Sequence, residues 1–185
     1  FRRVLFRSLA IHPVMTFTGT SVDLARLEDC PFGVTAPDAI RPVAEALVVE
    51  MGGEPVWVPE DARPLYHAAL AFSANYLMTL VTTSLELLAD AGVHDPRRLV
   101  GPLLGASLDN ALRSGDAALT GPVARGDAQT VALHLERISA ASPLAADAYR
   151  ALARLTTDRA VAAGLIDVGA AAGLLHVLGG EGERT

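Results

Sequence analysis

His12 is the first residue of this chain with a side chain suited to acid–base chemistry. It follows a short apolar run, Leu9–Ile11, and precedes Pro13, which favours extended backbone, so we expect it where a strand meets a loop. Open α/β sheets bind ligands at the carboxyl ends of their strands, and a neutral imidazole accepts a proton near pH 7. The sequence therefore suggests His12 as a catalytic residue, either a proton acceptor or a substrate anchor. The alternative is a structural histidine bonded to a loop carbonyl.

A second group of polar residues lies in the long apolar stretch 61–91, which predicts one helix with Gly92 as its stop. His67 and Asn75 are eight residues apart, which places them about 12 Å apart along such a helix. They can therefore line one pocket without bonding each other, and Ser73 lies on a neighbouring edge. The alternative role for these side chains is hydrogen bonding between packed helices. Because the stretch is apolar almost all round, we expect neighbouring elements to bury it.

A third polar group surrounds the corner at 119–126, where the sequence reads Leu-Thr-Gly-Pro-Val-Ala-Arg-Gly. Asn110 precedes this corner, and Arg125 lies within it. Arg125 can bind an anion in a bidentate way. The alternative is that it ties two helix ends together, with Asp127 or backbone carbonyls as its partners.

The elements expected to position these residues are three short strands followed by helices. Apolar runs at 9–11, 32–35 and 55–58 predict the strands, and helical spacing at 37–51 predicts the crossover between the second and third, which makes that pair parallel. After Pro59 every predicted element is a helix. The chain is thus expected to be mainly α, with an α/β part at 9–60 holding two to three parallel strands, a helical domain at 61–178 and a polar tail at 179–185. Residues 1–8 resemble a translated sequencing adapter, so we expect the natural protein to extend upstream.

Composition excludes several classes of function. The net charge is −6, which argues against nucleic acid or an anionic membrane as a partner. No uninterrupted apolar segment reaches the length of a membrane span, and the single cysteine suits a reducing cytoplasm. The histidines are dispersed, so no metal site is expected, and no G-x-G-x-x-G dinucleotide fingerprint occurs. All fifteen basic residues are Arg, which removes any lysine chemistry.

Several motifs resemble one bacterial family, in which a Rossmann-like NAD(P)-binding domain precedes a domain of unknown function of the type numbered 2520. They are His-Pro-x-x-Thr-Phe at 12–17, Phe-Gly-Val-Thr at 32–35, Tyr-His-Ala-Ala at 66–69, Ser-x-Asn-Tyr at 73–76 and the stretch Thr-Gly-Pro-x-x-Arg-Gly-Asp-x-x-Thr at 120–130. Together with the residue types and spacings, this leads us to expect that His12, His67 and Asn75 are catalytic and that Thr16, Ser73, Asn110 and Arg125 bind substrate. The resemblance implies NAD or NADP as the cofactor, bound mainly by a domain upstream of this chain.

The order of elements is also similar to prephenate dehydrogenase and, more loosely, to ketopantoate reductase and 6-phosphogluconate dehydrogenase. In the first family a histidine of a His-Pro stretch lies beside the substrate, and His12 matches it. The resemblance implies a helical bundle of the kind found in the C-terminal part of 6-phosphogluconate dehydrogenase. We therefore expect the substrate-binding and dimerisation portion of a cytoplasmic, homodimeric NAD(P)-dependent oxidoreductase acting on a small molecule. The alternative is a ligand-sensing or scaffold protein that kept the fold without catalysis.

Overall fold

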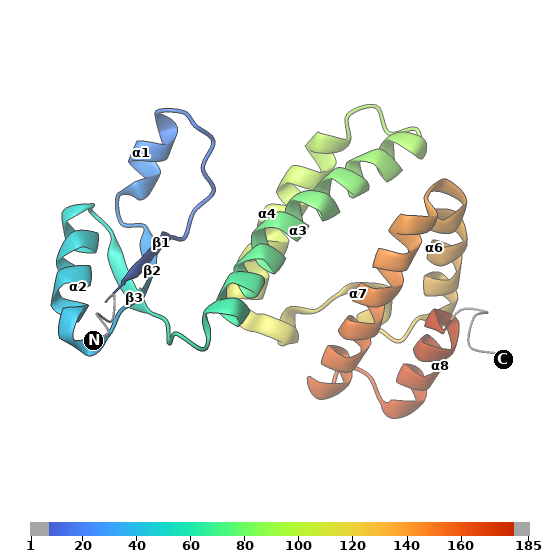
Figure 1. The fold of residues 1–185 in the computed structure, drawn as a ribbon. Helices are drawn as coiled ribbons and strands as arrows, with labels where there is room; N and C mark the ends of the chain where they lie inside the picture. Colours follow the sequence, from blue (N-terminus) through green and yellow to red (C-terminus); the bar gives the residue numbers. More distant parts are fainter. Residues whose placement is uncertain (1–7, 180–185) are drawn as a thin grey trace, which may run out of the picture. The chain divides into compact units, whose positions relative to one another are not determined.

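A computed structural model describes residues 8–179 and shows a small sheet followed by a series of helices (Figure 1). The chain divides into two compact units, one ending at Thr79 and the other beginning at Leu80. The division falls inside the longest helix, so each unit contains part of that helix. The prediction of a mainly helical chain with a small sheet near its start is confirmed.

The sheet of the first unit contains three strands in the order β1 (Ala10–Pro13), β2 (Pro31–Thr35) and β3 (Glu54–Trp57). β2 and β3 are parallel, as the crossover predicted, and α2 (Arg41–Glu50) with a preceding 3-10 turn, η1 (Asp38–Ile40), connects them. Ala44 and Val48 of this helix are fully buried with Phe32 and Val34 of the central strand. This cluster is the core of the first unit.

Of the two to three parallel strands predicted, the sheet contains two, because β1 runs in the opposite direction. β1 pairs antiparallel with β2, with Ala10 opposite Thr35 and His12 opposite Gly33. The link between them holds only a short helix, α1 (Val22–Leu27), whereas a parallel pair needs a crossover element that packs over the sheet. His12 therefore does not lie at a shared carboxyl edge, because the end of β1 lies beside the start of β2.

The loop before α1 is organised by Asp23, a buried carboxylate. It accepts hydrogen bonds from the backbone N–H groups of Thr18 and Gly19 and from the Thr18 hydroxyl. Burial acts to raise the pKa of Asp23, but these hydrogen bonds outweigh it and hold the pKa below its usual value. Asp23 therefore stays ionised at neutral pH and fixes this loop.

The longest helix, α3 (Arg63–Asp90), is much more exposed than its composition suggested. None of its residues is buried, and the side chains of Leu65 and Met78 are 76% and 69% exposed. The prediction that neighbouring elements bury this helix is therefore wrong for the single chain. By length and composition alone, α3 is the one helix in the described part of the chain that is apolar enough to cross a membrane, a test that core helices of soluble proteins also pass.

The second unit continues with α4 (Pro96–Ser114), a 3-10 turn η2 (Gly115–Ala118), α5 (Gly121–Ala124), α6 (Ala128–Ala141), α7 (Pro143–Ala162) and α8 (Val168–Leu178). α6, α7 and α8 pack against one another (Figure 1). Their core contains Val131, Leu135, Ala153, Leu174 and Leu178. Side-chain caps begin each of the three: Asp127, Ser142 and Asp167 accept a backbone N–H three residues ahead.

Candidate functional site

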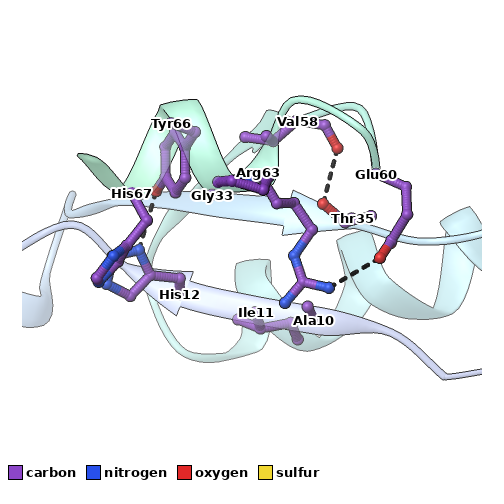
Figure 2. A pocket seen from close by; sticks show the side chains of 11 residues that line it. Ala10, Ile11, His12, Gly33, Thr35, Val58, Glu60, Arg63, Tyr66 and His67 are labelled. Atoms are coloured by element: carbon purple, nitrogen blue, oxygen red, sulfur yellow. Dashed lines mark hydrogen bonds and ion pairs between the residues drawn. The ribbon is translucent and has the colours of Figure 1, made fainter. Parts of the chain in front are cut away.

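A pocket of about 530 Å³ lies within the first unit (Figure 2). Its walls come from β1, β2, the loop after β3 and the first turns of α3. Its polar side chains are those of His12, Thr35, Glu60, Arg63, Tyr66 and His67. The antiparallel pairing of β1 with β2 is what brings His12 under the start of α3, since it places His12 opposite Gly33.

The central contact of this pocket joins His12 and Tyr66. Nδ1 of His12 lies 3.0 Å from the Tyr66 hydroxyl, and the two rings are perpendicular, with centroids 5.8 Å apart (Figure 2). Nε2 of His12 has no hydrogen-bond partner among residues 8–179. The ring of His12 is exposed, so this second nitrogen is available to a ligand.

Tyr66 is half-buried, and burial raises its pKa above the ordinary value of 10.0, with a smaller contribution from the thiol of Cys30. The phenol therefore keeps its proton at neutral pH. A neutral phenol can donate to Nδ1 of His12 or accept from it. Either way, the contact occupies Nδ1 and leaves Nε2 as the nitrogen that can exchange a proton with a ligand.

His67 lies one residue further along α3, and its ring centroid is 6.3 Å from that of His12. The pocket thus brings together two of the three residues proposed as catalytic. No group of three or more His, Cys, Asp and Glu side chains in the described part of the chain is arranged to hold a metal ion. Two imidazoles and a phenol suit proton transfer and hydrogen bonding to a small polar ligand.

The far wall of the pocket holds an ion pair. Nη1 of Arg63 lies 3.0 Å from a carboxylate oxygen of Glu60, and the Thr35 hydroxyl donates to the carbonyl of Val58 at 2.7 Å. The second contact ties β2 to the loop after β3, next to this pair (Figure 2). Glu60 engages one nitrogen of the guanidinium, so Arg63 keeps further N–H groups for an anionic ligand.

The other predicted site residues do not line this pocket. Thr16 is exposed in the loop after β1, and the Ser73 hydroxyl donates to the Leu70 carbonyl of its own helix. Asn75 is exposed two turns beyond His67. Asn110 on α4 and Arg125 after α5 belong to the second unit. The roles assigned to these five residues stay predictions.

The corner at 119–130 has a clear structural role. Asp127 accepts hydrogen bonds from the backbone N–H and the hydroxyl of Thr130, which caps α6. Gly126 has a positive φ of 71°, and a β-carbon there would lie 2.8 Å from that of Ala170 on α8. Gly126 is therefore needed both for its backbone conformation and for close packing. Among residues 8–179 no hydrogen bond or ion pair joins Arg125 to Asp127, although the charge of Arg125 acts on this carboxylate.

Four residues with polar side chains in the pocket were not among the predicted site residues: Thr35, Glu60, Arg63 and Tyr66. Tyr66 had a sequence signal, because it is adjacent to His67 in the Tyr-His-Ala-Ala motif. Thr35 had the same kind of signal, because it ends the Phe-Gly-Val-Thr motif. Glu60 and Arg63 had none, since their place in the pocket depends on the path of the chain into α3.

Residues 30–156 match the model of the family described as "Domain of unknown function (DUF2520)". The match covers more than half of the chain, and the chain belongs to this family. The resemblance drawn from the sequence motifs is thereby confirmed at the level of the family. No curated protein matches the chain.

Two solved structures have the same fold. One is protein TM1727 from Thermotoga maritima, with a TM-score of 0.70 and 24% identity, covering 83% of this chain. The other, from Bacteroides fragilis, is BF3122, described as a "putative NADP oxidoreductase", with a TM-score of 0.66 and 22% identity, covering 80% of this chain. The chain spans 62% of the length of the first structure and 56% of the second. At these identities the likeness establishes the fold.

Proposed function

We propose that the chain is the substrate-binding and dimerisation portion of an NAD(P)-dependent oxidoreductase. The contact between His12 and Tyr66 is the observation that carries this proposal, because it leaves one imidazole nitrogen available in a pocket of substrate size. The fold shared with the Bacteroides fragilis protein supports it. We retain the expectation that the helical unit is of the 6-phosphogluconate dehydrogenase C-terminal kind.

In this proposal His12 handles the proton of the reaction. Oxidation of an alcohol removes a proton from oxygen and a hydride from carbon. With Nδ1–H donating to the Tyr66 hydroxyl, Nε2 of His12 accepts the hydroxyl proton and the imidazole becomes an imidazolium. In the reverse direction the imidazolium returns this proton to the carbonyl oxygen. His67 offers a second hydrogen bond to the same oxygen.

Arg63 suits the anchoring of an acidic substrate. It is the one permanently cationic side chain among the residues lining the pocket, and the chain as a whole is acidic. A carboxylate or phosphate on the substrate would compete with Glu60 for the guanidinium, and a bidentate contact favours the substrate. Arg63 thus fits the anion-binding role that the sequence suggested for Arg125.

The described residues do not themselves provide a dinucleotide cradle. A Rossmann site places a glycine-rich turn between a strand and the start of a helix, and no such sequence follows β1, β2 or β3. NAD(P) supplies hydride chemistry in this class of enzyme. In this proposal residues outside this chain bind NAD(P), and the residues of this chain carry out the proton step.

The dimerisation role rests on the exposed apolar side chains of α3 and α4. α3 carries no formally charged side chain between Arg63 and Glu86. The exposed residues are Leu65, Phe72, Tyr76, Leu77, Met78 and Leu80 on α3 and Leu99, Leu103, Leu108 and Leu112 on α4. Exposed apolar side chains that recur along a helix mark an interaction site, and a second copy of the chain presents the same helix in return.

The test uses the natural full-length protein with NAD+ and NADP+ and a panel of small hydroxy acids and their oxo counterparts. His12→Gln should lower kcat by about 10²–10⁴, the contribution of a general acid–base catalyst. Arg63→Gln should mainly raise KM, and His94→Gln, a change at an exposed histidine outside the pocket, should alter neither. Turnover that survives His12→Gln would contradict the proposal. Ligand binding without any turnover would favour a ligand-sensing protein instead.

A further inference from the structure

Gly33 occupies a position in β2 where the structure leaves no room for a side chain. It is buried, lies opposite His12 in the sheet and directly under the ring of Tyr66. A β-carbon on Gly33 would lie 2.6 Å from Cζ of Tyr66 and closer still to its hydroxyl oxygen. The φ of Gly33 is not in the positive range, so its backbone conformation does not require a glycine. What it contributes is space.

We propose that Gly33 is a positioning residue for His12. Its bare α-carbon gives the Tyr66 phenol its place above the strand, and Tyr66 in turn occupies Nδ1 of His12. Nε2 is then the nitrogen presented to a substrate. This inference rests on the proposed role of His12. Gly33 would influence that role without touching the ligand.

The three residues form one linked unit across three elements of the fold. Pairing of β1 with β2 sets the position of His12 relative to Gly33, and the first turns of α3 bring Tyr66 onto the same spot (Figure 2). A methyl group on Gly33 would push the Tyr66 ring off the strand. The Tyr66 hydroxyl would then leave Nδ1, and the imidazole of His12, which is exposed, would turn freely.

Nitrogen-15 NMR of the histidine rings in the whole chain tests this directly, because Nδ1 and Nε2 give distinct signals for each tautomer. His12 should show a single tautomer in the unaltered chain. Gly33→Ala and Tyr66→Phe should each convert it to the mixed signal of an exposed histidine such as His94, and the double variant should show no additional change. Gly101→Ala is the matched control, because a β-carbon at Gly101 meets nothing within 4 Å.

A folded Gly33→Ala chain with unchanged His12 signals would overturn the proposal, as would an effect of Gly33→Ala on His12 that persists when Tyr66 is Phe. Should Gly33→Ala unfold the chain, Gly33→Ala combined with Tyr66→Ser should restore folding, since the smaller side chain removes the clash. Continued unfolding would also overturn the proposal. The tautomer itself separates the two claims: a proton on Nε2 would contradict His12 as the proton acceptor and leave the role of Gly33 intact.

Discussion

Nδ1 of His134 lies 3.0 Å from the hydroxyl of Tyr149, and the two ring planes meet at 81°. The same distance and a similar ring angle relate His12 to Tyr66 in the other unit. Burial raises the pKa of Tyr149, so this phenol also stays neutral. The surroundings of the two pairs differ: Tyr149 packs against the core of the helical unit, whereas Tyr66 lines a pocket. The His134–Tyr149 pair therefore has a structural role, joining α6 to α7.

Tyr149→Phe tests that role, because it removes the hydroxyl and keeps the ring. We expect the helical unit to lose about 0.5–1.5 kcal/mol of unfolding free energy, the net contribution of one hydrogen bond. Denaturant unfolding followed by circular dichroism measures this loss. Tyr76→Phe is the control, since Tyr76 is 60% exposed in the single chain. Equal effects of the two substitutions would contradict the assignment.

Leu174 and Leu175 are neighbours on α8 with opposite environments. Leu174 is fully buried in the core of the second unit, whereas Leu175 is 43% exposed. Leu174→Ala should cost about 2–5 kcal/mol through lost burial and the cavity left behind. Leu175→Ala should cost less than about 1 kcal/mol. Guanidinium denaturation of both variants measures the difference in unfolding free energy. A larger loss for Leu175→Ala would show that α8 packs on the core with the face that carries Leu175.

Asp127 makes the stability of the α6 start depend on pH. The hydroxyl and then the backbone N–H of Thr130 lower its pKa below 3.8, against an opposing effect of burial, and the charges of Arg125 and His134 lower it further. Well above pH 3.8 the carboxylate is ionised in both the folded and the unfolded chain, so its stabilisation is complete. As the pH falls below 3.8, the unfolded chain takes up the proton first and the stabilisation is lost.

Asp127→Asn should therefore lower Tm at pH 7, because the neutral amide is a weaker acceptor for the Thr130 groups. The difference from the unaltered chain should shrink as the pH is taken from 5 to 3, and thermal melts across that range measure it. Asp158→Asn, at an exposed position of α7, should leave Tm at pH 7 nearly unchanged. A difference that stays constant down to pH 3 would contradict the assignment.

Leu112→Glu and Leu144→Glu test the proposed dimer surface. The two leucines are 79% and 82% exposed in the single chain, but only Leu112 belongs to α4. A charge buried between two copies is unfavourable, so Leu112→Glu should shift the chain towards monomer at micromolar concentration, and Leu144→Glu should not. Sedimentation equilibrium gives the masses. An unaltered chain that is monomeric in buffer, or one that binds lipid vesicles through α3, would contradict the proposal.

Local signals allowed most elements to be predicted from the sequence. Asp127 and the Ser142-Pro143 pair mark the starts of α6 and α7, and Gly92 follows the end of α3. Each signal acts within a few residues, because capping groups bond the first or last helical turn. One motif of the family resemblance, the stretch at 120–130, likewise contains the capping residue and the start of α6.

The pocket could be predicted only in part, because strand pairing sets it. His12 and His67 stood out as residue types, but their meeting depends on β1 running antiparallel to β2, and no local signal fixes that direction. Glu60 and Arg63 look like ordinary surface residues in the sequence. The exposure of α3 could not be predicted either, because an apolar pattern shows that a helix prefers to be covered without showing what covers it.

The packing of α6, α7 and α8 has a consequence for how the second unit acquires its structure. Each of these helices contacts the next one along the chain, and α6 and α8 also meet. Contacts between segments close in sequence require little loop closure before they form, and such topologies fold quickly. We therefore expect the segment from Ala128 to Leu178 to reach its native packing early, before the less local pairing that brings His12 of β1 to Tyr66 of α3.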